Sequence, residues 1–255
     1  MSNIVQSVGR ALSILELLAD YDEGLGITEI GEKASLHKST VHRLLGTLIY
    51  KGFVEQSEIT NKYRISLKLY ELGSKRIAGM DLVSASKLYT KELMENTNEV
   101  VHLVVRDGND IVYTDKVDAN NTIRVMTSAI GKRSELYSTS VGKAILAFLD
   151  EAEVERIWAE SDIKKWTSNT ITDLGELKSE LELIRHNGYA EDNEENELGV
   201  RCVGAPVFNH DGVVEGAISV SGPTIRVTRD KVEELGGLVK KYADLISREL
   251  GYNKV

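Results

Sequence analysis

The stretch ASLHKSTVHRLLGTLIYKGF (residues 34–53) decides the fold of the first part of this chain. Its apolar residues recur at the spacing of an amphipathic helix: Val41, Leu44, Leu45, Leu48 and Ile49. The stretch contains two histidines, two lysines and an arginine but no acidic residue, although the whole chain of 255 residues has a formal net charge of −9. A helix kept free of negative charge in an acidic protein suits a negatively charged surface.

The face opposite the apolar stripe carries the polar side chains that would meet such a surface. They are Lys38, Ser39, Thr40, His42, Arg43 and Thr47. Small hydroxyls and arginine reach base edges in the major groove of DNA, whereas lysine binds the phosphates. A carboxylate on this face would be repelled by both rows of phosphates. For this stretch taken alone, an ordinary amphipathic helix with an accidental charge bias remains the alternative.

The elements around this helix follow the order of a winged helix-turn-helix domain. Residues 7–20 predict a first helix, whose apolar face consists of Val8, Ala11, Leu12, Leu15 and Leu18. The breaker DEGLG separates it from a second helix that starts at residue 27. Two short strands, GFVEQ and KYRI, follow the third helix and place Lys62 and Arg64 on the returning strand. This order predicts a DNA-binding domain over residues 1–68.

Charge is divided unevenly along the chain. Residues 1–80 contain 10 Lys and Arg against 9 Asp and Glu, a net charge of +1, whereas residues 81–255 contain 21 against 31, a net charge of −10. A polyanion would therefore meet the first part. Cys202 is the only cysteine, which excludes an intramolecular disulfide and a multi-cysteine metal site. The sequence shows no signal segment and no apolar run near the roughly 18 residues of a membrane span, so we expect a cytoplasmic protein with no cofactor.

Residues 66–99 are rich in helix formers and predict two consecutive helices. The first is a linker helix over residues 69–80, and the second opens the next domain. Leu69, Leu72 and Ile77 would pack either on the first domain or on the linker of a second chain.

Residues 81–255 alternate strand-like and helix-like segments. Two hairpins are expected, with turns at Asp107-Gly108 and Asp211-Gly212, because Asp-Gly suits the positive φ angles of a tight turn. TIRVM (122–126) reads as a further strand. Helices are expected at residues 140–149, 151–160, 174–187 and 228–250. The pattern predicts an α+β fold built on a mainly antiparallel sheet.

Three segments of this second domain carry polar residues suited to a small ligand. In YSTSVGKAILAFL (137–149), small residues precede a helix whose first amides would bind a carboxylate, or the hydroxyls would only cap the helix. In GYAEDNEENELGVRCVGAPVFN (188–209), five acidic residues form either a solvated loop or, with less support, a cation site. In ISVSGPT (218–224), Ser219 and Ser221 share one face of a strand, which would be a ligand surface or a polar outer edge.

The chain resembles the IclR family of bacterial transcription regulators in both parts. KSTVHRLLGTL is similar to the recognition helix of that family. The second segment above matches the family signature at nine positions: Gly188, Asp192, Glu195, Cys202, Val203, Gly204, Val207, Phe208 and Asn209. The resemblance implies a winged helix-turn-helix domain, a linker helix and a GAF-like effector-binding domain over residues 81–255.

The resemblance also implies a binding pocket for a small carboxylate effector. Its groups would be the backbone amides at Ser140 and Val141, together with Asp192, Cys202, Ser219 and Ser221. Asp192 would repel a carboxylate, so it should meet the hydroxylated end of the ligand. LYSTSVGKAILAF and GYAEDNEENELGVRC look like the subgroup of repressors that respond to 2-keto-3-deoxygluconate in sugar-acid and pectin catabolism. Gly222 departs from that subgroup, which has a bulky residue there, and a glycine near the pocket mouth would admit a larger ligand.

The family resemblance implies a repressor that binds palindromic operator DNA as a homodimer or homotetramer. The competing class is an enzyme of sugar-acid metabolism that carries a nucleic-acid-binding module. The five histidines form neither an HExxH motif nor a triad pattern with a serine elbow, and Cys202 lies in the strand-like segment VRCVG, where a structural cysteine is the commoner case. We therefore expect no enzymatic activity.

Overall fold

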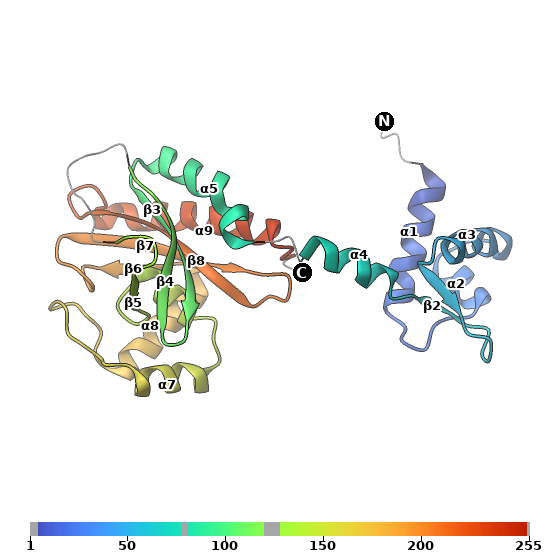
Figure 1. The fold of residues 1–255 in the computed structure, drawn as a ribbon, viewed down its shortest axis with the longest axis horizontal. Helices are drawn as coiled ribbons and strands as arrows, with labels where there is room; N and C mark the ends of the chain where they lie inside the picture. The colour runs from blue at the N-terminus through green and yellow to red at the C-terminus, as the bar shows by residue number, and fades with distance from the viewer. Residues whose placement is uncertain (1–4, 78–80, 120–127, 254–255) are drawn as a thin grey trace. The chain divides into compact units, whose positions relative to one another are not determined.

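The computed structural model describes residues 5–77, 81–119 and 128–253 (Figure 1). The chain divides into two compact units, an amino-terminal unit of residues 1–79 and a carboxy-terminal unit of residues 80–255. The amino-terminal unit has one hydrophobic core, and the carboxy-terminal unit has two.

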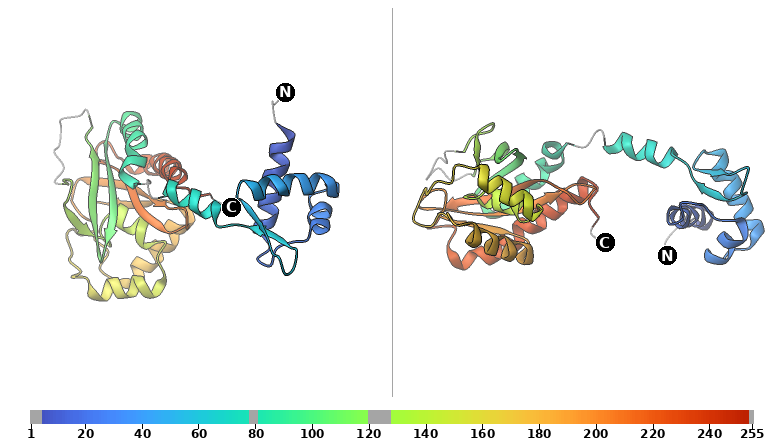
Figure 2. Two further views of the ribbon diagram at one scale, coloured as in Figure 1. Left: turned by 45° about the vertical axis from the view of Figure 1, so that its right-hand side comes forward. Right: turned by 90° about the horizontal axis from the view of Figure 1, so that it is seen from below.

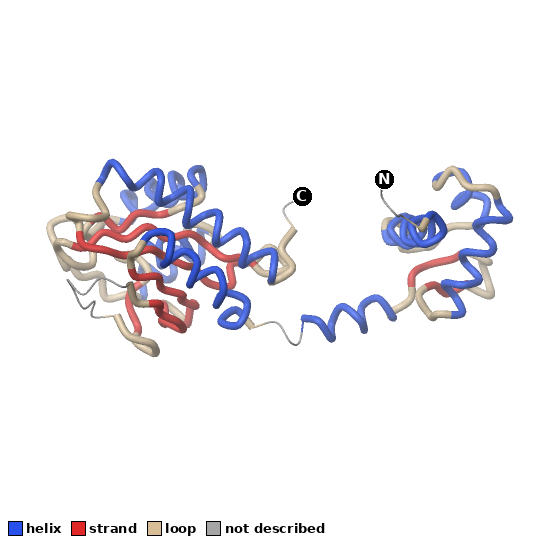
Figure 3. Tube along the Cα trace, turned by 90° about the horizontal axis from the view of Figure 1, so that it is seen from above, coloured by secondary structure: helices blue, strands red, loops and turns tan. Residues whose placement is uncertain are grey.

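The amino-terminal unit begins with three helices, which are followed by a two-stranded antiparallel wing and a fourth helix (Figure 3). Its elements are α1 (Gln6–Ala19), α2 (Ile27–Lys33), α3 (Lys38–Tyr50), β1 (Val54–Gln56), β2 (Tyr63–Ile65) and α4 (Lys68–Ile77). Leu25 and Tyr63 exchange two backbone hydrogen bonds of 2.9 and 2.8 Å, so an isolated β-bridge ties the segment before α2 to the wing. The order is that of a winged helix-turn-helix domain.

The core of this unit confirms most of the apolar stripe of α3, although Ile49 is exposed, and it corrects the stripe expected for α1. Val41, Leu45 and Leu48 of α3 are buried. In α1 the buried residues are Ile14, Leu15 and Leu18, whereas Val8 and Leu12 are 55% and 54% exposed. The amino-terminal half of α1 therefore presents an apolar surface to its surroundings.

The carboxy-terminal unit is built on a six-stranded antiparallel sheet with the strand order β5-β4-β3-β8-β7-β6. Its strands are β3 (Val100–Asp107), β4 (Asp110–Val117), β5 (Arg133–Glu135), β6 (Ala190–Asn193), β7 (Val200–Phe208) and β8 (Val214–Pro223). Its helices are α5 (Leu82–Thr97), α6 (Ser140–Leu146), α7 (Glu151–Glu160), α8 (Leu174–Asn187) and α9 (Val232–Glu249), the last preceded by the short 3₁₀ helix η1 (Arg229–Lys231).

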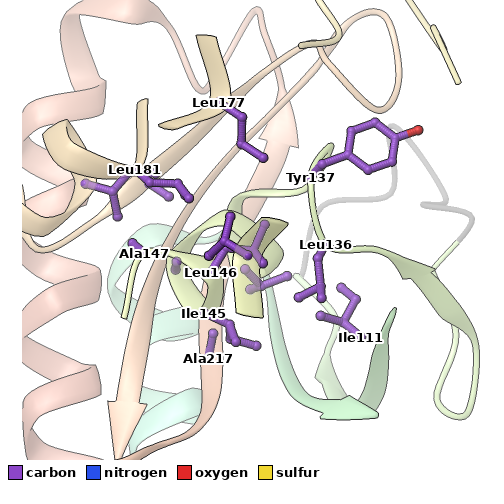
Figure 4. Close-up of a cluster of buried hydrophobic side chains, with 14 of the residues drawn as sticks. Ile111, Leu136, Tyr137, Ile145, Leu146, Ala147, Leu177, Leu181 and Ala217 are labelled. Atoms are coloured by element: carbon purple, nitrogen blue, oxygen red, sulfur yellow. The ribbon is translucent and has the colours of Figure 1, made fainter. Parts of the chain in front are cut away.

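Helices cover both faces of this sheet, as Figure 2 shows from two further directions. The long helices α5 and α9 pack on one face, where Leu103, Ile218 and Val220 meet Leu93 and Ile246. The opposite face packs against α6, α7 and α8, and the centre of that second core is drawn in Figure 4. Alternation along each strand therefore decides which residues face α6 and which face α9.

Most of the expected elements are confirmed in the carboxy-terminal unit. The predicted helices at residues 151–160 and 174–187 coincide with α7 and α8, whereas the predicted helix 140–149 ends earlier, at Leu146. Both expected Asp-Gly turns are present, with φ of +67° at Gly108 and +74° at Gly212. The strand expected at residues 122–126 lies outside the described residues. Among the helices of the described part, none has the length and apolar character that crossing a bilayer requires.

Candidate ligand cavity and nucleic-acid interface

The exposed face of α3 is the candidate nucleic-acid interface. The side chains of Lys38, Ser39, His42, Arg43 and Thr47 are exposed there, and Thr40 is half-buried. The helix contains no acidic residue, and within residues 5–77 neither Lys38 nor Arg43 makes an ion pair. The two cations are therefore available to an anionic partner.

The wing differs from α3 in its electrostatics. Arg64, which was expected to bind DNA, pairs with Glu55 across the two strands at 2.6 Å. Lys62 is half-buried beside it. Because both partners of this pair are largely exposed, the pair is weak and Arg64 can exchange Glu55 for a phosphate at little cost.

The candidate ligand site is a cavity of about 550 Å³, open mouth included, between α6 and the sheet face that α6 covers. Its lining comes from all six strands of the sheet, the segment before β5, the start of α6 and the turn after β6. The lining residues are His102, Tyr113, Ser128, Lys132, Ser134, Thr139, Ser140, Val141, Asp192, Asn196, Glu197, Val200, Cys202, Ser219 and Ser221. Most of them are polar, so the cavity suits a small polar molecule.

Strand register brings the polar floor of this cavity together. Asp192 of β6 lies opposite Cys202 of β7, which in turn lies opposite Ser221 of β8. One step along the strands, Ser219 lies opposite His102 of β3. Because Ile218 and Val220 alternate with the two serines and face α9, both hydroxyls must face the cavity.

The start of α6 forms the wall above this floor. Thr139 caps the helix, since its hydroxyl accepts a hydrogen bond of 3.1 Å from the amide of Gly142. Its carbonyl accepts the amide of Lys143 at 2.9 Å. The helix geometry leaves the amides of Ser140 and Val141 without an intrahelical acceptor beside the cavity. Gly204 permits the close approach of sheet and helix, because a Cβ there would lie 3.0 Å from the backbone of Ser140.

Asp192 is the buried acid of the cavity, with 3% of its surface exposed. Its Oδ1 accepts the backbone amides of Glu195 and Asn196 at 2.7 and 3.3 Å. Burial, together with repulsion from Glu195, raises the pKa of Asp192 to about 7, although Lys143 and the two amides oppose the shift. The carboxyl therefore changes its charge near neutral pH.

His102 is a neutral hydrogen-bonding group on the cavity floor. Burial, reinforced by the charge of Lys116, lowers the pKa of His102 to about 3. Its Nε2 lies 2.7 Å from the hydroxyl of Ser128, and its Nδ1 lies 3.3 Å from the hydroxyl of Ser221. One ring nitrogen donates and the other accepts, which orients both hydroxyls. Tyr113 packs against the ring edge-on, with the ring centroids 5.2 Å apart.

All six residues expected to bind an effector line this one cavity: Ser140, Val141, Asp192, Cys202, Ser219 and Ser221. Sequence reasoning missed His102 and Tyr113 on the same floor. A polar residue inside the otherwise apolar run VVHLVV was the available signal for His102. Gly222 does not line the cavity, because a Cβ there would point toward Glu99 and Val227, so its small size does not enlarge the site.

The acidic segment after β6 is only partly a solvated loop. Asp192 and Glu195 are buried, and Glu195 pairs with the buried ammonium of Lys143 at 2.5 Å. Glu191 pairs with the buried Arg201 at 3.0 Å. Charge composition predicted solvation because Lys143 lies 52 positions away from Glu195, and because the pairing of Arg201 with Glu191 depends on the fold of the β6–β7 hairpin.

Comparison with known proteins agrees with this architecture. Residues 7–58 match the family described as the IclR helix-turn-helix domain, and residues 74–248 match that described as the bacterial transcriptional regulator IclR C-terminal domain. The HTH-type transcriptional regulator KdgR of Dickeya chrysanthemi is 40% identical over 249 residues, which cover 98% of this chain and 81% of that protein.

Two solved structures place the same elements in space. The Agobacterium tumefaciens repressor BlcR has a TM-score of 0.82 and 26% identity, with 99% of this chain and 100% of that chain covered. The C-terminal domain of the E. coli transcriptional regulator KdgR has a TM-score of 0.61 and 38% identity, with 68% of this chain and 100% of that domain covered. The chain therefore belongs to the IclR family of bacterial transcriptional regulators, a non-enzymatic family that joins a DNA-binding helix-turn-helix domain to a small-molecule effector domain.

Proposed function

We propose that this regulator is a repressor released from its operator by a small hydroxylated keto acid, with 2-keto-3-deoxygluconate as the first candidate. The observation that carries the proposal is the cavity under α6, where amides, hydroxyls and one buried acid converge, as the recognition of a small hydroxylated acid requires. The similarity to KdgR regulators over nearly the whole chain supports this choice of ligand.

In this proposal the two ends of the ligand meet different parts of the cavity. The carboxylate accepts hydrogen bonds from the amides of Ser140 and Val141. The hydroxylated end lies on the floor, where Asp192, Ser219 and Ser221 can each exchange hydrogen bonds with hydroxyl groups. The Cys202 thiol fills the space between Asp192 and Ser221 as a weakly polar surface.

The proposed DNA complex is a homodimer, with the homotetramer as a pair of such dimers, on a palindromic operator. Two copies of α3 would then enter major-groove half-sites related by two-fold symmetry. Lys38, Ser39, Thr40, His42, Arg43 and Thr47 contact the DNA from α3, and Lys62 and Arg64 contact it from the wing. The ligand changes operator affinity only by binding the DNA-competent and DNA-incompetent arrangements unequally, and α4 is the segment that would transmit the difference.

A fluorescence anisotropy titration on duplexes from upstream of neighbouring genes tests the proposal. The titration is run at fixed salt with the full chain, because phosphate contacts make the affinity strongly salt-dependent. We expect one duplex to be bound specifically and released by 2-keto-3-deoxygluconate, but not by a neutral deoxy sugar of the same length. Binding that ignores both compounds would refute the ligand assignment. Failure to bind any of these duplexes at low ionic strength would refute the operator assignment.

A further inference from the structure

Lys143 is the largest fully buried side chain among the described residues, and it does not line the cavity. It lies on α6, behind the turn that presents Ser140 and Val141. Its ammonium is 2.5 Å from Oε1 of Glu195 and 3.7 Å from Oε1 of Glu180. Burying one charge without a partner is costly, so Glu195, the nearer of the two carboxylates, is the principal ion-pair partner of Lys143.

Glu195 fixes the turn that holds the acid of the cavity. Its backbone amide donates to Oδ1 of Asp192 at 2.7 Å, and its side-chain Oε1 also accepts the amide of Asn193 at 3.3 Å. Its carbonyl accepts the hydroxyl of Thr170 at 2.6 Å. Both the backbone and the side chain of Glu195 are therefore held in place, and through these bonds Glu195 fixes the position of Asp192.

The ion pair therefore joins the two walls of the cavity from behind. One wall is the start of α6, which contributes Thr139, Ser140 and Val141, and the other is the end of β6 with the turn that follows, where Asp192 at the edge of the floor is joined by Asn196. Oε2 of Glu195 is buried without a hydrogen-bond partner, so the carboxylate depends on Lys143 for compensation. Loss of either charge would leave the other buried and would free the two walls to separate.

We propose that Lys143 and Glu195 are positioning residues of the effector cavity: their ion pair sets the spacing of its two walls and the charge carried by Asp192. This inference rests on the proposed function of the cavity. Neither residue touches the ligand, and both act through the groups that they hold.

Glu195 and Lys143 act on the charge of Asp192 in opposite directions. Glu195 raises the pKa of Asp192 and Lys143 lowers it. The ionisable groups around Asp192 come from every element that packs against it: Lys143 of α6, Glu195 and Glu197 of the following turn, Cys202 of β7, Tyr113 of β4, His102 of β3 and Lys132 before β5. Of these groups, only Lys143 and Glu195 form the ion pair. Neutralising either one breaks the pair, but the two changes shift the charge of Asp192 in opposite directions, so the electrostatic and positioning roles can be distinguished.

Infrared spectroscopy of the ligand-free full chain measures these charges through the protonated-carboxyl band at pH 7. K143Q leaves two buried carboxyls without their cation, so the band grows relative to the wild type. E195Q leaves the cation beside Asp192, so the band shrinks, and D192N identifies the part of the band that belongs to Asp192. If the ion pair only held the two walls together, K143Q and E195Q would both break it and would change the band in the same direction. A change of the same direction in both, or no change in either, would overturn the proposal.

Should K143Q fail to fold, the double variant K143Q/E195Q replaces the pair by two neutral amides. Comparison with E195Q then isolates the charge of Lys143, and we expect Asp192 to titrate at higher pH in the double variant than in E195Q. An equal or lower titration in the double variant would overturn the electrostatic role.

Calorimetric titration with 2-keto-3-deoxygluconate tests the spacing of the walls. E195Q and the double variant are expected to lose affinity on the order of tenfold. The matched control is K178Q, which removes an ion pair between α8 and α7 at the surface, where Lys178 binds Glu151 and Glu155 at 2.7 and 2.5 Å. Wild-type affinity in E195Q would overturn the positioning role. No binding to the wild type would instead refute the ligand assignment, while the infrared test on ligand-free protein would still decide the electrostatic role.

Discussion

Replacing Asp192 by Asn is expected to stabilise the carboxy-terminal unit, and by more at pH 8 than at pH 5. The physical reason is the desolvated carboxylate. In the folded chain its pKa is raised to about 7 from an ordinary value of 3.8, mainly by burial and by the neighbouring Glu195. Folding therefore opposes ionisation of this group. The free energy of unfolding is reduced at every pH at which the carboxyl would be ionised in the unfolded chain.

The sign and size of the effect follow from linkage. A carboxyl whose folded pKa is raised leaves stability intact below the unfolded pKa and reduces it as the pH rises toward the folded pKa. At pH 5 the penalty is about 1.5 kcal/mol, and at pH 8 it reaches about 4 kcal/mol. Asn has an oxygen in the same place, so it can still accept the amides of Glu195 and Asn196. The stability gained in D192N should therefore grow by about 2.5 kcal/mol between pH 5 and pH 8.

Urea unfolding followed by tryptophan fluorescence measures this difference. The two tryptophans, Trp158 and Trp166, both lie in the carboxy-terminal unit, so the signal reports that unit alone. The matched control is D162N, because the side chain of Asp162 is 82% exposed and its loss should give no such dependence on pH. A gain in D192N that is equal at pH 5 and pH 8, or a loss of stability at pH 8, would refute the reasoning.

Three further substitutions test the DNA-binding face, the cavity floor and the packing of α6. R43A should weaken specific operator binding by about 1–3 kcal/mol in an anisotropy titration at fixed salt, because the guanidinium of Arg43 is exposed on α3 and can bond a base edge. Unchanged specificity would exclude Arg43 from base contact. S219A should blunt ligand-induced release while binding without ligand stays intact; loss of that binding would contradict the division of labour between the two units. G142A should destabilise the carboxy-terminal unit by about 1–3 kcal/mol or more in urea, because a Cβ would lie 2.2 Å from the carbonyl oxygen of Leu136, and wild-type stability would contradict this packing.

Periodicity was most informative where a single face of an element is buried. The apolar stripe of α3 and the extents of α7 and α8 could be predicted because their apolar residues recur with helical spacing beside clear boundaries. In α1 the apolar residues outnumber the positions that its unit can bury. The spacing therefore could not tell Ile14, which is buried, from Leu12, which is exposed.

In the cavity, too, features set by local sequence could be predicted, whereas contacts between distant segments could not. Alternation in β8 placed Ser219 and Ser221 on one face, but only the sheet order shows that this face meets Asp192 and His102. The pairing of Lys143 with Glu195 joins residues 52 positions apart, and no local pattern marks either one as buried. Composition therefore predicted that the acidic segment is solvated, whereas in the structure Glu195 is buried and paired with Lys143.

Cys202 has a practical consequence for following how the ligand acts. It is the only sulfhydryl of the chain and is half-buried in the lining of the cavity, where desolvation raises its pKa well above the usual value; the thiol therefore stays protonated at neutral pH, which slows its reaction with maleimides. A cysteine introduced by E58C on the exposed tip of the wing would be labelled selectively, with the native residue left in place. In the proposed dimer, spin labels attached to this cysteine in the two wings would report the distance between them. Measured with and without effector, that distance would show whether the two DNA-binding domains move apart.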